Sequence, residues 1–316
     1  EGEYLITSTI KLKSGISLIG EANNKKTGGS IIKADSNLES MIHTPPANGH
    51  HMRIENITLD GGANEKCKVK WGIDLLDFCG SRVGNIKINN IDGGGIRVSN
   101  AKETSMPSWV VCLEKIHVQS KDFGIYFSGS DAYINNIVVS GGKGIYHDGG
   151  GDVVNNIQVI STQLGFIHEG NGLSIADSVF KNNDKYGVTF NDAKLTNIIG
   201  CRFKNNLKGD ISLEDSSKIN ICENALLSKK TKSGQNIHIK SGVELISVTN
   251  NFFANSKLKI KENNSIASGN SFSISEDNVS NFGLKPWPDE DEIFKRIFTI
   301  TNQNSKVEVI NVNDMV

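Results

Sequence analysis

Two short segments of this chain place a carboxylate at the same position of a repeated phrase. Residues 144–150 read GIYHDGG and residues 165–171 read GFIHEGN, so Asp148 and Glu169 are equivalent positions twenty-one residues apart. Two crowded carboxylates raise each other's pKa, which lets one stay protonated while the other is ionised. Cleavage of a glycosidic bond needs this division between an acid and a base. Asp148 and Glu169 are therefore candidate catalytic residues.

Related positions of neighbouring phrases carry residue types that suit the binding of a sugar. Tyr126 and Tyr146 could form a flat apolar platform for a sugar ring, although tyrosine is also simply a good strand residue. Arg97 could hold the carboxylate of an acidic sugar through a bidentate contact. It could equally form a salt bridge with Asp74, the equivalent residue of the preceding phrase. Tyr126, Tyr146, Arg97 and Asp74 form the predicted substrate-binding set.

The elements that must position these residues are short strands. The phrase recurs as GIDLL, GIRVS, GIYFS, GIYHD, GFIHE, GVTFN and DISLE, and before each lies a second phrase such as ENITLDGG or NNIVVSG. Both phrases alternate apolar and other residues over four or five positions, the period of a strand with one buried face. The last apolar residue of the second phrase recurs at intervals of 19 to 30 residues, often near 21. Helical spacing does not fit this span.

A period near 21 with short strands and Asn/Gly corners indicates a stacked β-solenoid. A leucine-rich repeat would show a leucine consensus and a helical segment, and a propeller blade needs about 40 residues. The sequence therefore predicts an all-β protein, a right-handed parallel β-helix of ten or more coils over residues 1–280. Residues 281–316 break the repeat and are predicted to form a C-terminal cap or an oligomerisation segment.

Stacking of the coils would turn each position of the phrase into a column. The residue after the glycine is expected to point inward, which predicts an internal stack of Ile73, Ile96, Ile125, Ile145, Phe166 and Val188. The next residue points outward and gives the column Asp74, Arg97, Tyr126, Tyr146, Ile167, Thr189 and Ser212. The outward fourth position gives Leu76, Ser99, Ser128, Asp148, Glu169, Asn191 and Glu214. Asp148 and Glu169 thereby become neighbours.

Alternatives remain for these residues. Asp148 and Glu169 could belong to a solvated ladder of acids, although stacked like charges destabilise each other unless something offsets them. Glu214, two coils beyond Glu169, and Asp192, beside the column, are reserve catalytic candidates. His147 and His168 occupy inward positions, which favours an internal hydrogen-bonded pair over a catalytic role.

Composition excludes other classes of function. The net charge of −1 with interspersed charges leaves no basic face for nucleic acid, and no apolar run approaches the roughly 20 residues of a membrane span. Cys67, Cys79, Cys112, Cys201 and Cys222 are odd in number and lack metal-ligand spacing, so buried free thiols are expected. We expect neither a metal nor a cofactor.

Residues 4–35, YLITSTIKLKSGISLIGE to GGSIIKAD, resemble the opening coils of the pectate-lyase-like superfamily, in the form found in phage tailspikes and capsule depolymerases. The resemblance extends to about Phe272. It implies a polysaccharide substrate, a homotrimer with a site within or between subunits, and a location outside the cell or on a virion. Such proteins usually carry a capping helix before the first strands, so the chain is expected to be a fragment or a processed product.

Three functions compete. The first is a glycoside hydrolase that cleaves a bacterial capsular or surface polysaccharide through the acids described above. The second is a lyase on an acidic glycan, with Tyr126, Tyr146, Arg97 and Lys143 as possible base and carboxylate-binding groups. The third is a spike or adhesin that only binds glycans. No calcium-binding carboxylate cluster of the pectate-lyase type is evident, which favours the hydrolase, and the variable coils favour a site over an adhesin.

Overall fold

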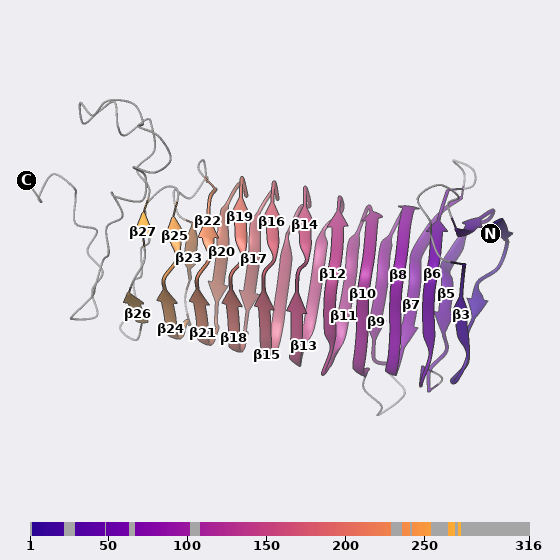
Figure 1. Cartoon of the computed structure of the whole chain (residues 1–316), viewed down its shortest axis with the longest axis horizontal. Helices are drawn as coiled ribbons and strands as arrows, with labels where there is room; N and C mark the ends of the chain where they lie inside the picture. Colours follow the sequence, from indigo (N-terminus) through magenta and orange to yellow (C-terminus); the bar gives the residue numbers. More distant parts are fainter. Residues whose placement is uncertain are drawn as a thin grey trace, which may run out of the picture.

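The computed structural model describes residues 2–21, 29–47, 49–62, 67–101, 108–228, 236–240, 242–253, 265–268 and 271–272. In these residues every regular element is a strand, each pairing is parallel, and the strands stack along one long axis (Figure 1). The predicted all-β parallel β-helix is confirmed. Its right-handed sense and its number of coils stay predictions, and residues 281–316 lie outside the described part.

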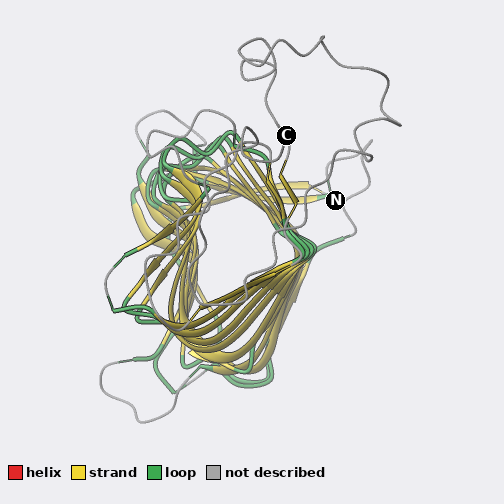
Figure 2. Ribbon diagram, turned by 90° about the vertical axis from the view of Figure 1, so that its left-hand side faces the viewer, coloured by secondary structure: helices red, strands yellow, loops and turns green. Residues whose placement is uncertain are grey.

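Each complete coil passes over three faces, which the view along the axis shows as the sides of the solenoid (Figure 2). In one coil, residues 144–149 lie on the first face, residues 152–155 on the second and residues 158–160 on the third. Several strands bend around a corner and so contribute to two faces.

The first face, which carries the predicted site, is formed by β2 (Ile10–Lys11), β5 (Leu38–Thr44), β7 (Val69–Leu76), β9 (Gly94–Ser99), β11 (Phe123–Ser130), the first parts of β13 (Gly144–Asn155) and β15 (Phe166–Ala176), β17 (Tyr186–Asn191), β20 (Gly209–Glu214) and β23 (Ile237–Ile239).

The second face is formed by β3 (Ser17–Ile19), the first parts of β6 (Arg53–Asp60), β8 (Cys79–Ile91), β10 (Trp109–Ser120) and β12 (Tyr133–Ser140), the second parts of β13 and β15, and β18 (Lys194–Ile199), β21 (Ser217–Cys222), β24 (Glu244–Thr249) and β26 (Ser265–Ser268). The third face is formed by β1 (Gly2–Ile6), β4 (Ser30–Ala34), the second parts of β6, β8, β10 and β12, and β14 (Gln158–Ile160), β16 (Val179–Lys181), β19 (Arg202–Lys204), β22 (Ala225–Leu226), β25 (Phe252–Phe253) and β27 (Ser271–Phe272).

A single left-handed residue per coil makes the corner between the second and third faces. These residues have φ between +48° and +64° and are Asn56, Asn85, Lys115, Asn136, Asn156, Asp177, Gly200, Glu223 and Asn250. Asparagine tolerates this region better than most residues, which explains the Asn-rich corners of the sequence. The stacked amides also bond to one another, as in the 2.8 Å bond from Asn85 Nδ2 to Asn56 Oδ1.

The glycine that opens the first-face phrase is required by close packing between coils. Gly144 and Gly165 have φ of +97° and +76°, where other residues are strained. A Cβ on Gly144 would lie 2.0 Å from the carbonyl oxygen of Gly165, and one on Gly165 would lie 2.2 Å from that of Tyr186. Larger residues would therefore separate the coils that carry Asp148 and Glu169.

Stacked aliphatic and aromatic side chains fill the interior. The six residues of the predicted internal stack pair in register and are at most 1% exposed, which confirms that prediction. Farther along the axis, Phe180 and Phe203 stack with ring centroids 5.1 Å apart. The core is thus a set of continuous columns in which each coil covers the next.

The cysteines agree with the sequence analysis only in part. All five are free, but only Cys67, Cys79 and Cys201 are buried, whereas Cys112 and Cys222 are half-buried. Burial raises the pKa of Cys201 to about 12, which keeps it an unreactive thiol. Within the described residues, no helix is long and apolar enough to span a membrane.

The internal stack generates a stability prediction. Replacement of Ile125, which is 0% exposed, by alanine should leave a cavity in the stack and lower the free energy of unfolding by about 2–5 kcal/mol. The matched change Ile19→Ala, at a residue that is 53% exposed, should cost no more than about 0.5 kcal/mol. Urea unfolding followed by circular dichroism measures both, and equal losses would contradict the stack.

Candidate functional site

The register of the first face places the predicted residues in the expected columns. Tyr126 pairs with Arg97 on one side and with Tyr146 on the other, and Asp148 pairs with Ser128 and Glu169. Neighbouring strands lie about 4.8 Å apart, so the tyrosine pair and the carboxylate pair sit side by side on the exterior. This juxtaposition follows from the strand pairing and defines the candidate site.

The two tyrosines form the predicted platform. The rings of Tyr126 and Tyr146 are stacked, with centroids 4.8 Å apart and planes inclined by 14°. Trp71 contacts Tyr126 edge-on at 6.5 Å, and Phe123 lies 6.2 Å from Tyr126 and 5.8 Å from Tyr146. Both tyrosines are half-buried, so an aromatic group on the N-terminal side of the carboxylates keeps part of its surface open to solvent.

Two donors hold the Glu169 carboxylate. The Tyr146 hydroxyl donates to Oε2 at 2.7 Å, and the Asn191 amide donates to Oε1 at 3.3 Å. Both bonds cross between coils, so Glu169 is fixed from both sides. Burial and the bond to Glu169 raise the pKa of Tyr146 well above its usual value, which keeps the phenol protonated.

Asp148 is the open member of the carboxylate pair. It is exposed, and it makes no hydrogen bond or ion pair with the part of the chain that the structure describes. Its register partner Ser128 is small, so the column is free of bulky side chains on that side. Asp148 and Glu169 therefore differ in environment although the sequence places them in equivalent positions.

Arg97, the arginine of the predicted binding set, forms a salt bridge with Asp74. Arg97 donates to both oxygens of Asp74, from Nε at 2.6 Å and from a terminal nitrogen at 2.7 Å. His43 Nδ1 lies 3.2 Å from the same carboxylate. Asp74 is only 6% exposed, so it is covered although its position belongs to an outward column. Of the two alternatives for Arg97, the structure shows the salt bridge.

The reserve acids lie apart from the pair. Glu214 follows Asn191 in the column and forms an ion pair with Lys240, one further coil along the axis. Asp192 is exposed and lies 3.8 Å from Lys194. The structure therefore groups Asp148 with Glu169 and separates both from these two acids.

A buried polar group lies beneath the site, and sequence reasoning found only part of it. His147 and His168 are fully buried with their Nδ1 atoms 3.1 Å apart, as predicted for an internal pair. Asp152, which is 1% exposed, lies 3.3 Å from His147 Nε2 and accepts a 2.5 Å bond from the backbone of Ala132. The register pairs Asp152 with Leu173, and an acid in an apolar column was the available signal for it.

Burial makes this group sensitive to acid. Desolvation, aided by the neighbouring His147, lowers the pKa of His168 to about 3. Its Nε2 atom makes no hydrogen bond among the described residues. His168 is therefore neutral in the folded protein near pH 7.

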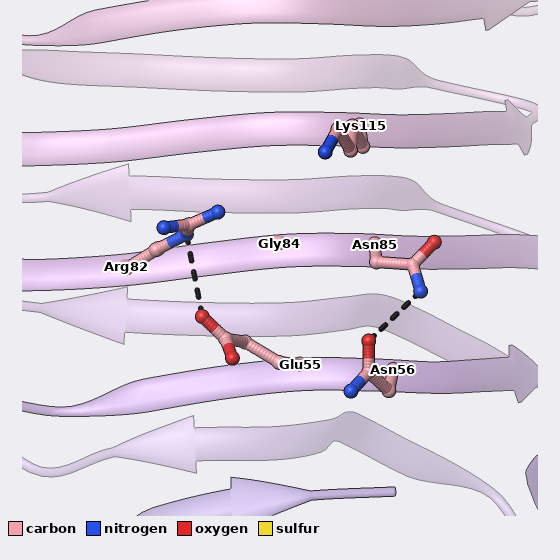
Figure 3. Close-up of a pocket in the computed structure, with 6 residues that line it drawn as sticks. All are labelled: Glu55, Asn56, Arg82, Gly84, Asn85 and Lys115. Atoms are coloured by element: carbon pink, nitrogen blue, oxygen red, sulfur yellow. Dashed lines mark hydrogen bonds and ion pairs between the residues drawn. The ribbon is translucent and has the colours of Figure 1, made fainter. Parts of the chain in front are cut away.

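Sequence reasoning also missed a pocket on the second face. It has a volume of about 330 Å³ and is lined by Glu55, Asn56, Arg82, Gly84, Asn85 and Lys115 (Figure 3). None of these residues belongs to the predicted site. The available signal was the glycine of the phrase GNI, where the neighbouring phrases ENI and EKI carry a glutamate.

Within the described residues, no group of three or more His, Cys, Asp and Glu side chains is arranged to hold a metal ion. Residues 1–189 match the family described as rhamnogalacturonase A/epimerase, pectate lyase-like. No curated protein is significantly similar to the chain.

Several solved structures share the fold. One is the A-module of the mannuronan C-5 epimerase AlgE6 of Azotobacter vinelandii, with a TM-score of 0.67 and 14% identity over 87% of this chain and 90% of that one. Another is the Dettilon tailspike protein gp208, with a TM-score of 0.67 and 12% identity over 85% of this chain and 59% of that one. A third is the tailspike gp49 of the Acinetobacter baumannii bacteriophage Fri1, described as a capsular polysaccharide depolymerase, with a TM-score of 0.56 and 10% identity over 90% and 59%. At these identities the similarity concerns the fold.

The buried histidine generates a pH prediction. The unfolded chain binds a proton at His168 below about pH 6.5, whereas the folded chain does not until about pH 3. The free energy of unfolding should therefore receive the full contribution of His168 above pH 6.5 and lose it as the pH falls from 6.5 toward 3. The slope from this residue approaches about 1.4 kcal/mol per pH unit. His168→Leu should reduce the slope between pH 6.5 and 5.5 in urea unfolding.

The control is His51→Asn, at an exposed residue whose φ of +51° suits asparagine. This variant should keep the slope of the parent protein. A parent slope that His168→Leu leaves unchanged would show that His168 is not held neutral.

Proposed function

The chain belongs to the rhamnogalacturonase A/epimerase, pectate lyase-like family, and from this premise we propose that it is a glycoside hydrolase that cleaves a polysaccharide. The observation that carries the proposal is the arrangement on the first face. A stacked pair of tyrosines lies directly beside two carboxylates on adjacent coils, and one of these carboxylates is fixed by a tyrosine. Such a surface can hold a sugar ring and present an acid and a base to its glycosidic bond.

The different environments of the two carboxylates suggest their roles. Glu169 accepts hydrogen bonds from Tyr146 and Asn191, and a carboxylate accepts at both oxygens in its ionised form. We assign Glu169 the role of base or nucleophile. Asp148, which is exposed and beside this second carboxylate, is assigned the role of proton donor to the leaving oxygen.

The state of the cations supports a hydrolase over a lyase. A lyase must neutralise the carboxylate of a uronic acid before it removes the neighbouring proton. Arg97 is bound to Asp74 through two hydrogen bonds, and Lys143 lies 2.8 Å from Asp122. The raised pKa of Tyr146 makes its phenol a proton donor and a poor base. Of the four groups proposed for a lyase, Arg97, Lys143 and Tyr146 are thus engaged elsewhere.

The substrate and the biological setting are proposed from the resemblance of the chain. We propose a bacterial capsular or surface polysaccharide as the substrate, a homotrimer as the assembly, and a virion or extracellular location. The tailspike gp49, described as a capsular polysaccharide depolymerase, shares the fold and supports this substrate class. In a trimer, a neighbouring subunit could add groups to the first face.

The carboxylate pair generates the central prediction. Asp148→Asn and Glu169→Gln keep size but cannot exchange a proton at neutral pH, so each should lower the rate of cleavage about 10² to 10⁴-fold. Binding of the intact polysaccharide should change little. A panel of capsular polysaccharides is incubated with each variant, and the products are analysed by mass spectrometry and ultraviolet absorbance.

The matched control is Asp192→Asn, which should stay within about threefold of the parent because the residue lies outside the pair. Hydrolysis adds the mass of one water to the products, whereas a lyase leaves an unsaturated end that absorbs ultraviolet light. An epimerase changes neither the mass nor the absorbance. An active Glu169→Gln variant beside an inactive Asp192→Asn or Glu214→Gln variant would move the site along the solenoid and refute the proposed roles.

The tyrosine pair generates a second prediction. Tyr146→Phe keeps the stack but removes the hydrogen bond to Glu169, a bond to a charged group, so we expect kcat to fall about tenfold or more. Tyr126→Phe removes no hydrogen bond that the structure shows and should stay within about threefold. Steady-state kinetics on the cleaved polysaccharide measures both, and equal effects would show that the Tyr146 hydroxyl does not support Glu169. Tyr146→Ala should instead weaken polysaccharide binding.

A further inference from the structure

The pocket on the second face has the features of a separate binding site. It is called the second-face pocket here and is formed by Glu55, Asn56, Arg82, Gly84, Asn85 and Lys115 (Figure 3). Its volume of about 330 Å³ lies within the range of small-molecule sites, about 300–1,000 Å³. It shares no residue with the first-face site, so what it binds does not depend on the proposed hydrolase activity.

A glycine creates this pocket. The register of the second face aligns Glu55, Gly84 and Glu114 on successive coils, at a position whose side chains point outward. Gly84 contributes no side chain, so a gap one coil wide opens between two glutamates. A Cβ at Gly84 would lie 3.2 Å from Arg82 Nε, which places this nitrogen at the floor of the gap.

The charges around the pocket leave one cation in excess. Arg82 donates to Glu114 at 2.7 Å and lies 3.3 Å from Glu55, while Arg53 also pairs with Glu55. Lys115 lies 3.7 Å from Glu114, a loose contact, and is largely exposed. Three cations thus surround two carboxylates. The pocket therefore favours a ligand with a single negative charge.

Unused hydrogen-bonding groups line the same space. Arg82 directs its Nε toward Glu55 and one terminal nitrogen toward Glu114, so its other terminal nitrogen makes no bond with the described residues on a half-exposed side chain. The bond from Asn85 Nδ2 to Asn56 Oδ1 leaves the Asn56 amide nitrogen as a donor and the Asn85 carbonyl as an acceptor, both without a further bond in the described part of the chain. A ligand must therefore both donate and accept hydrogen bonds.

We propose that the second-face pocket binds an acidic sugar unit. Its carboxylate would bind Lys115 and the terminal nitrogen of Arg82 that is not bonded to Glu114, and its hydroxyls would bond to the amides of Asn56 and Asn85 and to Glu55. Inorganic phosphate fits less well, because near pH 7 much of it is a dianion with a single hydroxyl, whereas the pocket has one cation in excess and two acceptors, Glu55 and the Asn85 carbonyl. A neutral sugar would leave the excess cation unpaired. Such a pocket would anchor an acidic polymer away from the first face and raise its effective concentration there.

The test is a titration of the labelled full chain with sodium D-glucuronate, followed by nuclear magnetic resonance of the asparagine side-chain amides. Millimolar glucuronate should shift the amide signals of Asn56 and Asn85, whereas methyl glucoside and inorganic phosphate should bind at least about fivefold more weakly. No shift with glucuronate, or an equal response to phosphate or to methyl glucoside, would overturn the proposal.

Two corner asparagines provide a matched pair of variants. Asn85 and Asn136 are both exposed and have φ of +52° and +55°. Each forms a side-chain hydrogen bond with an asparagine of an adjacent coil, but only Asn85 lines the pocket. Glycine suits this backbone, so Asn85→Gly and Asn136→Gly should both fold. Asn85→Gly should weaken glucuronate binding about fivefold or more, and Asn136→Gly should leave it unchanged. Equal affinities in the two variants would refute the site.

Gly84→Ala offers an independent check. Gly84 does not have a positive φ, so a methyl group fits the backbone but projects into the floor of the pocket beside Arg82. This variant should lose glucuronate binding and keep both its melting temperature and any cleavage at the first face. Retained binding in Gly84→Ala would place the ligand elsewhere.

Discussion

The parallel register of the coils is the constraint on which the rest of this structure depends. Each residue lies about 4.8 Å from its equivalent in the next coil, and the backbone bonds that fix this spacing leave little freedom to avoid that neighbour. On the surface and in the interior, each side chain therefore interacts mainly with the equivalent side chains of the two adjacent coils. Apolar residues gain from this arrangement, because an isoleucine above an isoleucine buries both.

Stacking has opposite consequences for different polar residues. Side-chain amides hydrogen-bond to each other, as in the pair Asn56 and Asn85 at the corner. In the buried pair Asn183 and Asn206 this hydrogen bond is 2.9 Å long. Like charges do not gain in this way. The two coils that contain Asp148 and Glu169 stack carboxylates outside, and inside they stack His147 and His168, which approach each other through Nδ1 but leave both Nε2 atoms without a hydrogen bond among the described residues. Tyr146 and Asn191 offset part of the cost of the stacked carboxylates outside, whereas inside His147 Nε2 and Asp152 Oδ2 lie 3.3 Å apart without a hydrogen bond between them. A concentration of local conflict in one place is typical of functional sites.

On the second face, the fixed spacing of the coils preserves a gap instead of bringing side chains together. There the column contains a gap, because Gly84 replaces the glutamate of its neighbours. In a solenoid, a missing side chain opens a space bounded above and below by whole side chains, since adjacent coils cannot move together to fill it. Small changes in a repeat can thus produce a pocket without any change of fold.

The sequence by itself determined the parallel β-helix and the alternation of inward and outward positions along the strands of the first face, because alternation and repeat length are properties of a line of residues. It therefore placed Tyr126 on Tyr146, Asp148 beside Glu169, and His147 and His168 in the interior. Only the tertiary structure decided that Arg97 binds Asp74, that Tyr146 donates to Glu169, that Asp152 reaches His147 across the interior, and that Gly84 opens a pocket. These contacts depend on side-chain rotamers and on where the chain turns each corner. Both are set by packing between coils and leave no periodic trace in the sequence.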